Sequence, residues 1–297
     1  MWRQFLVLLI ALMGMSLAEA QQKVGLFTPE KHPSRATVER AKADRTSRAA
    51  GGERNVWVFY TARIFPHLAV GPEWETSFVI VNMSLTPAQF NLGFFDTTGA
   101  PMTVSYTDGK SAAAASGAVV TQTLAAEGST VITVYNDGQP LRTGFAVLEP
   151  PADENQFRLG GYAVFKQRVA GRPDFEAVVP LCDYDDWAFY MPYDNSGNVD
   201  TGMALVNPSR DQTATVEMFF LDEAGVEISK QTLTLAPGAQ TAFSLPAKYP
   251  VLGGRRGTMY VESSIDYLSA LGLRFNLGGG GAFTSLPVMN WLGMFPQ

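Results

Sequence analysis

The stretch TGMALVNPSRDQTATVEMFFLDEAG, Thr201 to Gly225, repeats the plan of an earlier stretch, TSFVIVNMSLTPAQFNLGFFDTTG, Thr76 to Gly99. Each contains an apolar run, an Asn-x-Ser turn, a second apolar run and an Asp-x-x-Gly turn. The Thr, Asn and Ser of the two stretches are separated by one constant spacing, and the Asp and Gly by a spacing one residue longer. Such repetition indicates one structural unit used twice. The shared residues are therefore predicted to form strand ends and turns.

Short runs rich in β-branched and aromatic residues recur along both copies, separated by Gly, Pro, Asn and Asp. The long helical segments that a parallel sheet needs between its strands are missing. The sequence therefore predicts an all-β chain of two tandem antiparallel β-sandwiches, Ig-like or jelly-roll-like. The run 76–82 is predicted to be buried on both faces. The predicted strands are 55–65, 76–82, 89–96, 101–106, 118–124, 130–135, 144–148, 162–167, 175–180, 187–193, 201–207, 213–222, 227–235, 241–245, 257–262, 268–275 and 283–287.

Four segments are expected along the chain. Residues 1–20 have the basic start, apolar run and Ala-Glu-Ala end of a signal peptide, so we expect a secreted protein, extracellular or periplasmic. The apolar run is short for a membrane span, so the protein is not expected to span a membrane. Residues 21–54 are polar and basic and predict a flexible, disordered linker. The sandwiches are placed at 55–182 and 183–297.

The repeated pattern continues into Ser269 to Phe275 (SALGLRF) and Phe283 to Val288 (FTSLPV). With the Asn-x-Ser and Asp-x-x-Gly turns, it resembles tandem Ig-like β-sandwich repeats of secreted proteins from environmental bacteria. The resemblance covers roughly Phe65 to Val288. That family has no assigned activity, so the resemblance implies a fold and export but no site. The first copy departs from it, with GYAVFKQ at 161–167 where the second has ALGLRFN at 270–276.

Residue types that carry enzyme chemistry are scarce. The chain has one cysteine, Cys182, and two histidines, His32 and His67, and it lacks the Gly-x-Ser-x-Gly, His-Glu-x-x-His and Cys-x-x-Cys motifs. His67 is expected to be a loop histidine without a catalytic role, and Cys182 a small core residue at a strand end. We expect no enzyme. The net charge is −6 and the basic residues gather in the linker, so nucleic acid is not an expected partner.

Acidic residues cluster where the two sandwiches should meet and give the candidate metal ligands. Asp183 and Asp185 would lie on one side of an extended segment, and Asp194 and Asp200 follow within the alternating run D-N-S-G-N-V-D. The run faintly resembles a calcium loop without its central Gly and closing Glu. Calcium is the one cofactor considered, and a solvated turn is the alternative. The same acids could serve a carbohydrate-active enzyme.

Aromatic side chains give the candidate ligand-binding residues. Trp57 opens the tetrad W-x-F-Y, which recurs with Trp187 and Tyr190, and Trp74 lies between them in sequence. Exposed aromatic rings on a sandwich face can stack on sugar rings. Burial in a core is the alternative for all four.

These observations favour a secreted, non-enzymatic protein for surface interaction or adhesion, with a surface protein or polysaccharide as its partner. A carbohydrate-binding module is the alternative, and a carbohydrate-active enzyme the next. The Ala-rich segment Asp108 to Gly117 is predicted to be an exposed insertion. The oligomeric state is left open.

Overall fold

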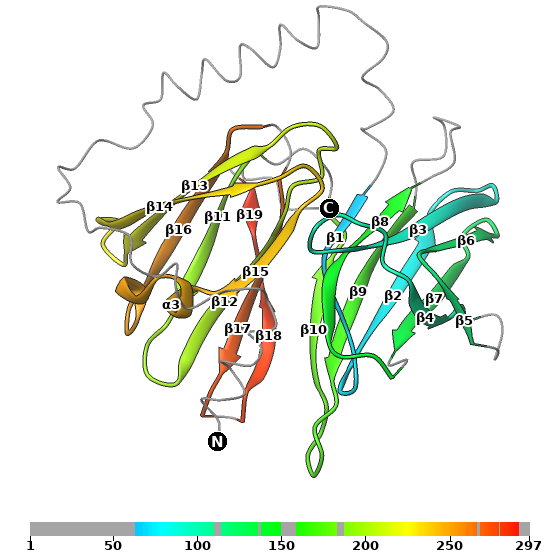
Figure 1. Cartoon of the computed structure of the whole chain (residues 1–297), viewed down its shortest axis with the longest axis horizontal. Helices are drawn as coiled ribbons and strands as arrows, with labels where there is room; N and C mark the ends of the chain where they lie inside the picture. The colour runs from blue at the N-terminus through cyan, green and yellow to red at the C-terminus, as the bar shows by residue number, and fades with distance from the viewer. Residues whose placement is uncertain are drawn as a thin grey trace, which may run out of the picture.

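The computed structural model describes residues 63–109, 114–135, 138–149, 159–182, 187–265, 268–278 and 280–290. The predicted signal peptide and linker, Trp57, Asp183 and Asp185 lie outside these ranges. The described chain is nearly all antiparallel β structure, which confirms the predicted all-β class (Figure 1). Within the described ranges, no helix combines the length and apolar character needed to cross a membrane.

The strands fall close to their predicted positions in both halves. Those of the first half are β1 (Arg63–Val70), β2 (Trp74–Asn82), β3 (Ala88–Asp96), β4 (Val104–Thr107), β5 (Ala115–Gly117), β6 (Val119–Leu124), β7 (Ser129–Tyr135), β8 (Arg142–Glu149), β9 (Leu159–Gln167) and β10 (Phe175–Pro180). Those of the second half are β11 (Ala188–Asp194), β12 (Val199–Val206), β13 (Ala214–Asp222), β14 (Glu227–Leu235), β15 (Gln240–Ser244), β16 (Arg256–Ser263), β17 (Ser269–Asn276), β18 (Ala282–Leu286) and β19 (Met289–Asn290). Between β15 and β16 lie a short helix α3 (Leu245–Lys248) and a 3-10 turn η2 (Pro250–Leu252).

Four antiparallel sheets share one strand order between the halves. Sheet A is β1-β8-β3-β6 and sheet C is β11-β16-β13-β14 with β19 added beside β11. Sheet B begins β10-β9-β2-β7 and continues with β4 and β5, and sheet D is β18-β17-β12-β15. Sheets A and B enclose one hydrophobic core and sheets C and D a second. Strands of the two repeated stretches, such as β2 and β12, therefore have equivalent neighbours.

One local prediction needs correction. The strand expected to close before Pro66 instead runs through it to Val70. Pro66 lies where the pairing with β8 is irregular, between Phe65 and Leu68, and β1 is an edge strand, so the missing N–H leaves no ladder bond broken. The Ala-rich segment is an exposed insertion, as predicted: its end forms β5, which pairs with β4, and sheet D has no counterpart of either strand.

The repeated Asn residues are buried turn supports, as predicted. Asn82 Nδ2 donates hydrogen bonds of 2.8 Å to the carbonyls of Thr86 and Ala125. Asn207 Nδ2 donates to three backbone carbonyls around the equivalent turn, at 2.8–3.1 Å. Because both side chains are fully buried, each amide satisfies carbonyls that water cannot reach.

The repeated Asp and Gly residues form matched tight turns. Asp96 Oδ1 and Asp222 Oδ1 each accept hydrogen bonds from two backbone N–H groups further along their turns, at 2.8–3.1 Å. Gly99 and Gly225 close those turns with φ of 85° and 77°, in the region that favours glycine. The repeat thus encodes turn geometry.

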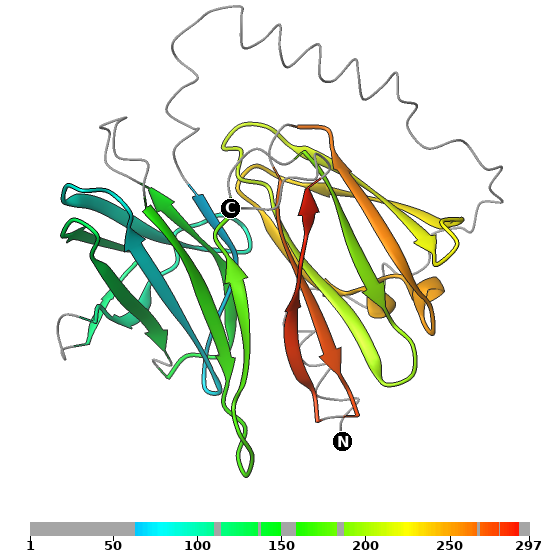
Figure 2. The same ribbon diagram turned by 180° about the vertical axis from the view of Figure 1, so that it is seen from behind.

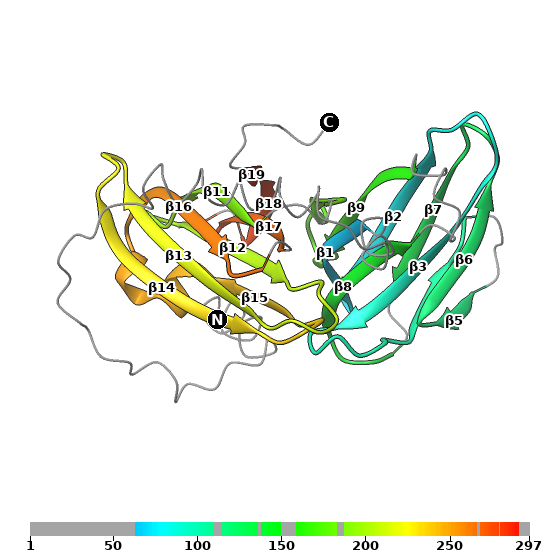
Figure 3. The ribbon, with the colours of Figure 1, turned by 90° about the horizontal axis from the view of Figure 1, so that it is seen from above.

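Sheet D is apolar on both faces and joins the two halves. Met203 and Leu205 of β12 point into the second core, while Ala204 between them points toward the first half. The side of the first half that carries its edge strands β1 and β10 lies against the outward face of sheet D (Figures 2 and 3), and we call it the open side of the first half. The outward side chains that join the core of the first half are Ala204, Ala242, Leu271, Leu273, Phe275 and Phe283.

A glutamine and a histidine form the polar centre of this joint. Gln240 Nε2 lies 3.2 Å from the carbonyl oxygens of Pro66 and Gly144 and 3.1 Å from His67 Nδ1. The two carbonyls require the amide nitrogen at that position, and because this nitrogen only donates, its contact with His67 Nδ1 is a hydrogen bond when Nδ1 carries no proton, as in a neutral ring. Burial lowers the pKa of His67 to about 4.

Candidate functional site

Trp74, one of the predicted ligand-binding residues, lies in the joint between the halves. Its ring stacks on Phe165 and on Phe283, with centroids 5.9 and 5.7 Å apart. Only 8% of Trp74 is exposed. The structure therefore places Trp74 in the core, where its ring offers no surface to a sugar.

Asp194 ends β11 and Asp200 lies at the start of β12, on either side of the β11–β12 turn. Asp194 Oδ1 accepts from the backbone N–H and the hydroxyl of Ser196, at 3.0 and 2.6 Å, and these bonds lower the pKa of Asp194. Asp200 is partly buried, which raises its pKa, and Ser244 Oγ lies 3.5 Å from its carboxylate. In the part of the chain that the structure describes, no group of three metal-binding side chains occurs.

The predicted inert residues lie in the joint. His67 is a buried strand residue, not a loop residue, because β1 continues through Pro66. Cys182 is half-buried, and its Sγ lies 3.8 Å from the carbonyl oxygen of Ala270 in the second half.

An aromatic row crosses the outward face of sheet C. Tyr190, Tyr260 and Phe219 lie opposite one another on β11, β16 and β13. The ring centroid of Tyr260 is 4.9 Å from that of Tyr190 and 5.8 Å from that of Phe219. Tyr260 and Phe219 are buried, and Trp187 and Tyr190 pack against them and stay partly exposed. We call these four residues the aromatic face.

Charged groups border the aromatic face. Glu217 and Glu262 lie directly opposite each other on β13 and β16, one row away from the rings. The Tyr260 hydroxyl donates a hydrogen bond of 3.1 Å to the Glu262 carboxylate. The Lys230 ammonium pairs with Glu217 at 2.9 Å and lies 4.6 Å from the centre of the Phe219 ring. Burial, with the nearby Glu217 carboxylate, raises the pKa of Glu262. The face therefore combines flat apolar rings with hydrogen-bonding groups.

Of the predicted aromatic residues, the structure brings Trp187 and Tyr190 together at this face. Their partners were missed by reasoning from the sequence. The signal was alternation within β13 and β16, where Glu217 and Phe219, and Tyr260 and Glu262, occupy outward positions between core residues. Outward aromatic and acidic residues within one strand can be found this way. Which of them become neighbours across two strands depends on the register of those strands.

A second exposed surface, the outward face of sheet B, was also missed. Tyr162, Val131 and Val178 are each 44% exposed there, around the half-exposed Val79. Val79 lies opposite both Tyr162 and Val131 in the neighbouring strands. The run 76–82 was predicted to be buried on both faces, which is wrong for this strand because nothing in the described chain covers its outward side.

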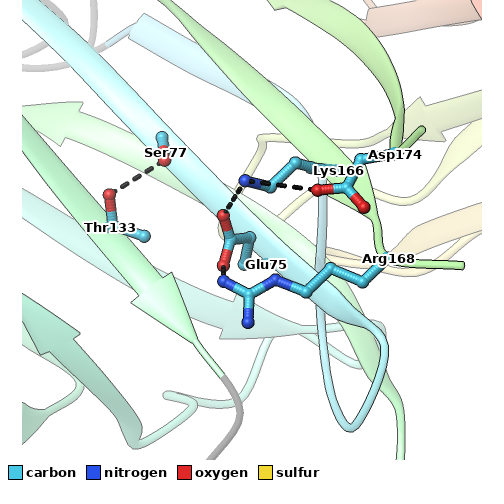
Figure 4. Close-up of polar contacts among 6 residues, drawn as sticks. All are labelled: Glu75, Ser77, Thr133, Lys166, Arg168 and Asp174. Carbon is cyan, nitrogen blue, oxygen red and sulfur yellow. Dashed lines mark hydrogen bonds and ion pairs between the residues drawn. The ribbon is translucent and has the colours of Figure 1, made fainter. Parts of the chain in front are cut away.

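The part of the sheet B face around the start of β2 is polar (Figure 4). Ser77 and Thr133 share a hydrogen bond of 2.8 Å between β2 and β7. Glu75 pairs with Lys166 at 2.5 Å and with Arg168, and Lys166 also lies 3.9 Å from Asp174. The charges of this group compensate one another, so the apolar rows beside them face a nearly neutral border.

Comparison with known proteins identifies no family. The chain matches no model of a known protein family, and no curated protein matches its sequence. Among solved structures, it is similar to vicilin from Capsicum annuum at 8% identity and a TM-score of 0.24, over 78% of this chain and 79% of that one. It is similar to the 7S globulin of Momordica charantia at 10% identity and a TM-score of 0.21, over 76% and 79%. Likeness this weak carries no argument about fold or function.

Proposed function

We propose that the chain is an exported, non-enzymatic tandem β-sandwich protein for surface interaction or adhesion, and that its aromatic face binds a polysaccharide. The two sandwiches of the proposal are the halves with matching strand order. The observation that carries the proposed ligand is the row Tyr190–Tyr260–Phe219 on an outward sheet face, bordered by carboxylates and a lysine.

The chemistry of this face fits a sugar better than other small ligands. An aromatic ring stacks on the apolar face of a pyranose, while carboxylates and an ammonium group bind its hydroxyls. Tyr260 packs beside the Tyr190 ring and Phe219 packs beside Tyr260, so the partly exposed Tyr190 is held against a row of rings. Holding the ring rigid lowers the entropy lost on binding.

The test is binding of the full chain to a panel of immobilised polysaccharides. Tyr190→Ala should weaken binding about tenfold, which corresponds to about 1.4 kcal/mol for one stacked ring. Trp187→Ala should weaken it to a similar or smaller extent. Leu85→Ala, which removes a side chain 77% exposed in a turn of the first half, is the matched control and should bind normally. Silence across the panel would contradict the proposal.

The same samples decide between binding and hydrolysis. Glu217 and Glu262 are the carboxylates nearest the rings, and opposed carboxyl groups are what glycosidases use. Non-enzymatic binding predicts no release of reducing sugar. Release that disappears in Glu262→Gln would replace the binding function by a carbohydrate-active enzyme.

A further inference from the structure

The outward faces of sheets B and D are equivalent surfaces. In each sheet, a central residue of the repeated strand lies opposite one residue on each neighbouring strand. The register matches Ala204 with Val79, Leu271 with Tyr162, and Ala242 with Val131. Both faces are apolar at these positions, so the surface that joins the halves has a counterpart in the first half.

The two faces differ in what covers them. Leu271 is 1% exposed because the open side of the first sandwich lies on it, whereas its counterpart Tyr162 is 44% exposed. Contiguous apolar side chains on an outward sheet face indicate an interaction surface. The equivalent sheet D face indicates what kind of surface fits, namely the open side of a sandwich.

The second half has an open side of the same construction. In the first half it is formed by β1 and β10, where Cys182 follows β10 and pairs with Ile64 of β1. In the second half it is formed by β11 and β18, where β19 follows β18 and pairs with β11. Met289 of β19 is 39% exposed there.

Two substitutions between the halves place opposite charges at matched positions of these surfaces, although Lys166 lies opposite Glu176 and Asp194 lies near Arg274. The joint within the chain stacks Phe165 on Phe283 at 4.9 Å. Phe165 corresponds in register to Arg274 on the open side of the second half, because each lies opposite the Thr that begins the repeated stretch. Phe283 corresponds to the exposed Glu176 on sheet B. A contact built on the same plan would therefore pair an arginine with a glutamate.

We propose that a second copy of this chain binds head to tail, with the open side of its second half on the sheet B face of the first copy. The contact repeats the joint within the chain and sets Arg274 of one copy against Glu176 of the other. Because the two surfaces differ, each copy in a pair keeps one surface unused, and the contact extends into chains or rings.

Mixing two blocked copies tests this arrangement. Tyr162→Asp should block the sheet B face, and Arg274→Glu the open side, so each variant alone should sediment as a monomer. Their mixture should form a one-to-one dimer and stop there, because one intact surface of each kind remains. The unaltered chain should form larger species as its concentration rises. Val119→Asp, at a valine 52% exposed on sheet A, is the matched control and should associate like the unaltered chain.

A charge exchange adds a second readout. Glu176→Arg and Arg274→Glu should each weaken association about tenfold or more, and the two changes combined in one chain should restore it. Thermal unfolding establishes that each variant is folded, and Arg274→Ala replaces Arg274→Glu if the latter is not. A monomer at every concentration overturns the proposal. So does a mixture that stays monomeric, or association lost in Tyr162→Asp but kept in both Arg274 variants, which would indicate a face-to-face contact.

Discussion

Strands β2 and β12 carry the two copies of one apolar run, yet they are buried differently. In β2, buried and half-exposed residues alternate from Trp74 to Asn82. In β12, every residue from Thr201 to Val206 is buried. Both strands are central in equivalent sheets, so the difference lies in what covers the outward side: solvent for sheet B and the first half for sheet D. An apolar run therefore indicates that a strand is central in its sheet. Whether the outward face of that strand is buried depends on a distant part of the chain.

The largest expected effect separates two matched positions, Leu271 on sheet D and Tyr162 on sheet B. Leu271→Ala should lower the free energy of unfolding by about 3 kcal/mol, because it leaves a cavity in the joint. Tyr162→Ala should lower it by less than about 1 kcal/mol, because Tyr162 is 44% exposed and its removal leaves no enclosed cavity. Urea unfolding at low protein concentration measures both. Equal losses would mean that the two faces are covered alike.

The next effect concerns acid and the joint. His67 has a folded-state pKa of about 4, below its ordinary value of 6.5. The unfolded chain binds a proton on His67 below about pH 6.5 and the folded chain does not, so stability rises with pH across this window and is lost as pH falls toward about 4. Between about pH 7.5 and about pH 5, His67 should account for about 2 kcal/mol of lost stability.

A variant isolates this contribution from that of the carboxylates. His67→Gln keeps a hydrogen-bonding side chain beside Gln240 but cannot take up the proton. Its free energy of unfolding should fall about 2 kcal/mol less between those two pH values than that of the unaltered chain. Parallel pH profiles for the two proteins would show that His67 is already solvated in the folded state.

The smallest effect belongs to the charged border of the sheet B face. Glu75→Gln removes the carboxylate that pairs with Lys166 and Arg168. The loss of stability should stay below about 1 kcal/mol and shrink in high salt, because the partners reach solvent. Unfolding at low and high ionic strength provides the comparison. A larger loss that salt leaves unchanged would indicate that this face is shielded from water.

Much of the strand and turn structure could be predicted from the sequence, because those features are local. The Asn at the end of the first strand and the Asp-x-x-Gly turn carry their own hydrogen-bonding geometry, and both copies form it. The continuation of β1 through Pro66 was missed because it depends on an irregularity in the pairing with β8. The two halves were expected to meet, but the residues of the joint were missed because no local pattern states that the outward face of sheet D meets the first half.

The candidate site could be predicted only in part, for the same reason. Trp74 and Tyr190 are both aromatic residues beside repeated strands, and the sequence treats them alike. The structure buries Trp74 against Phe283 of the other half and leaves Tyr190 half-exposed. Glu262 and Glu217 become neighbours through the register of β13 and β16, which composition does not report.

Thiol labelling at the matched positions Val131 and Ala242 is the most direct test of the central claim. That claim is that the outward faces of sheets B and D are equivalent and differ only in whether the first half buries them. Val131→Cys and Ala242→Cys are each made in a Cys182→Ser background, since Cys182 is the chain's single cysteine. At low protein concentration, the cysteine at 131 should react at the rate of a solvated thiol. The cysteine at 242, where Ala is 9% exposed, should react about a hundredfold more slowly, which requires about 2.7 kcal/mol of protection by the joint. Equal rates at the two positions would contradict the account.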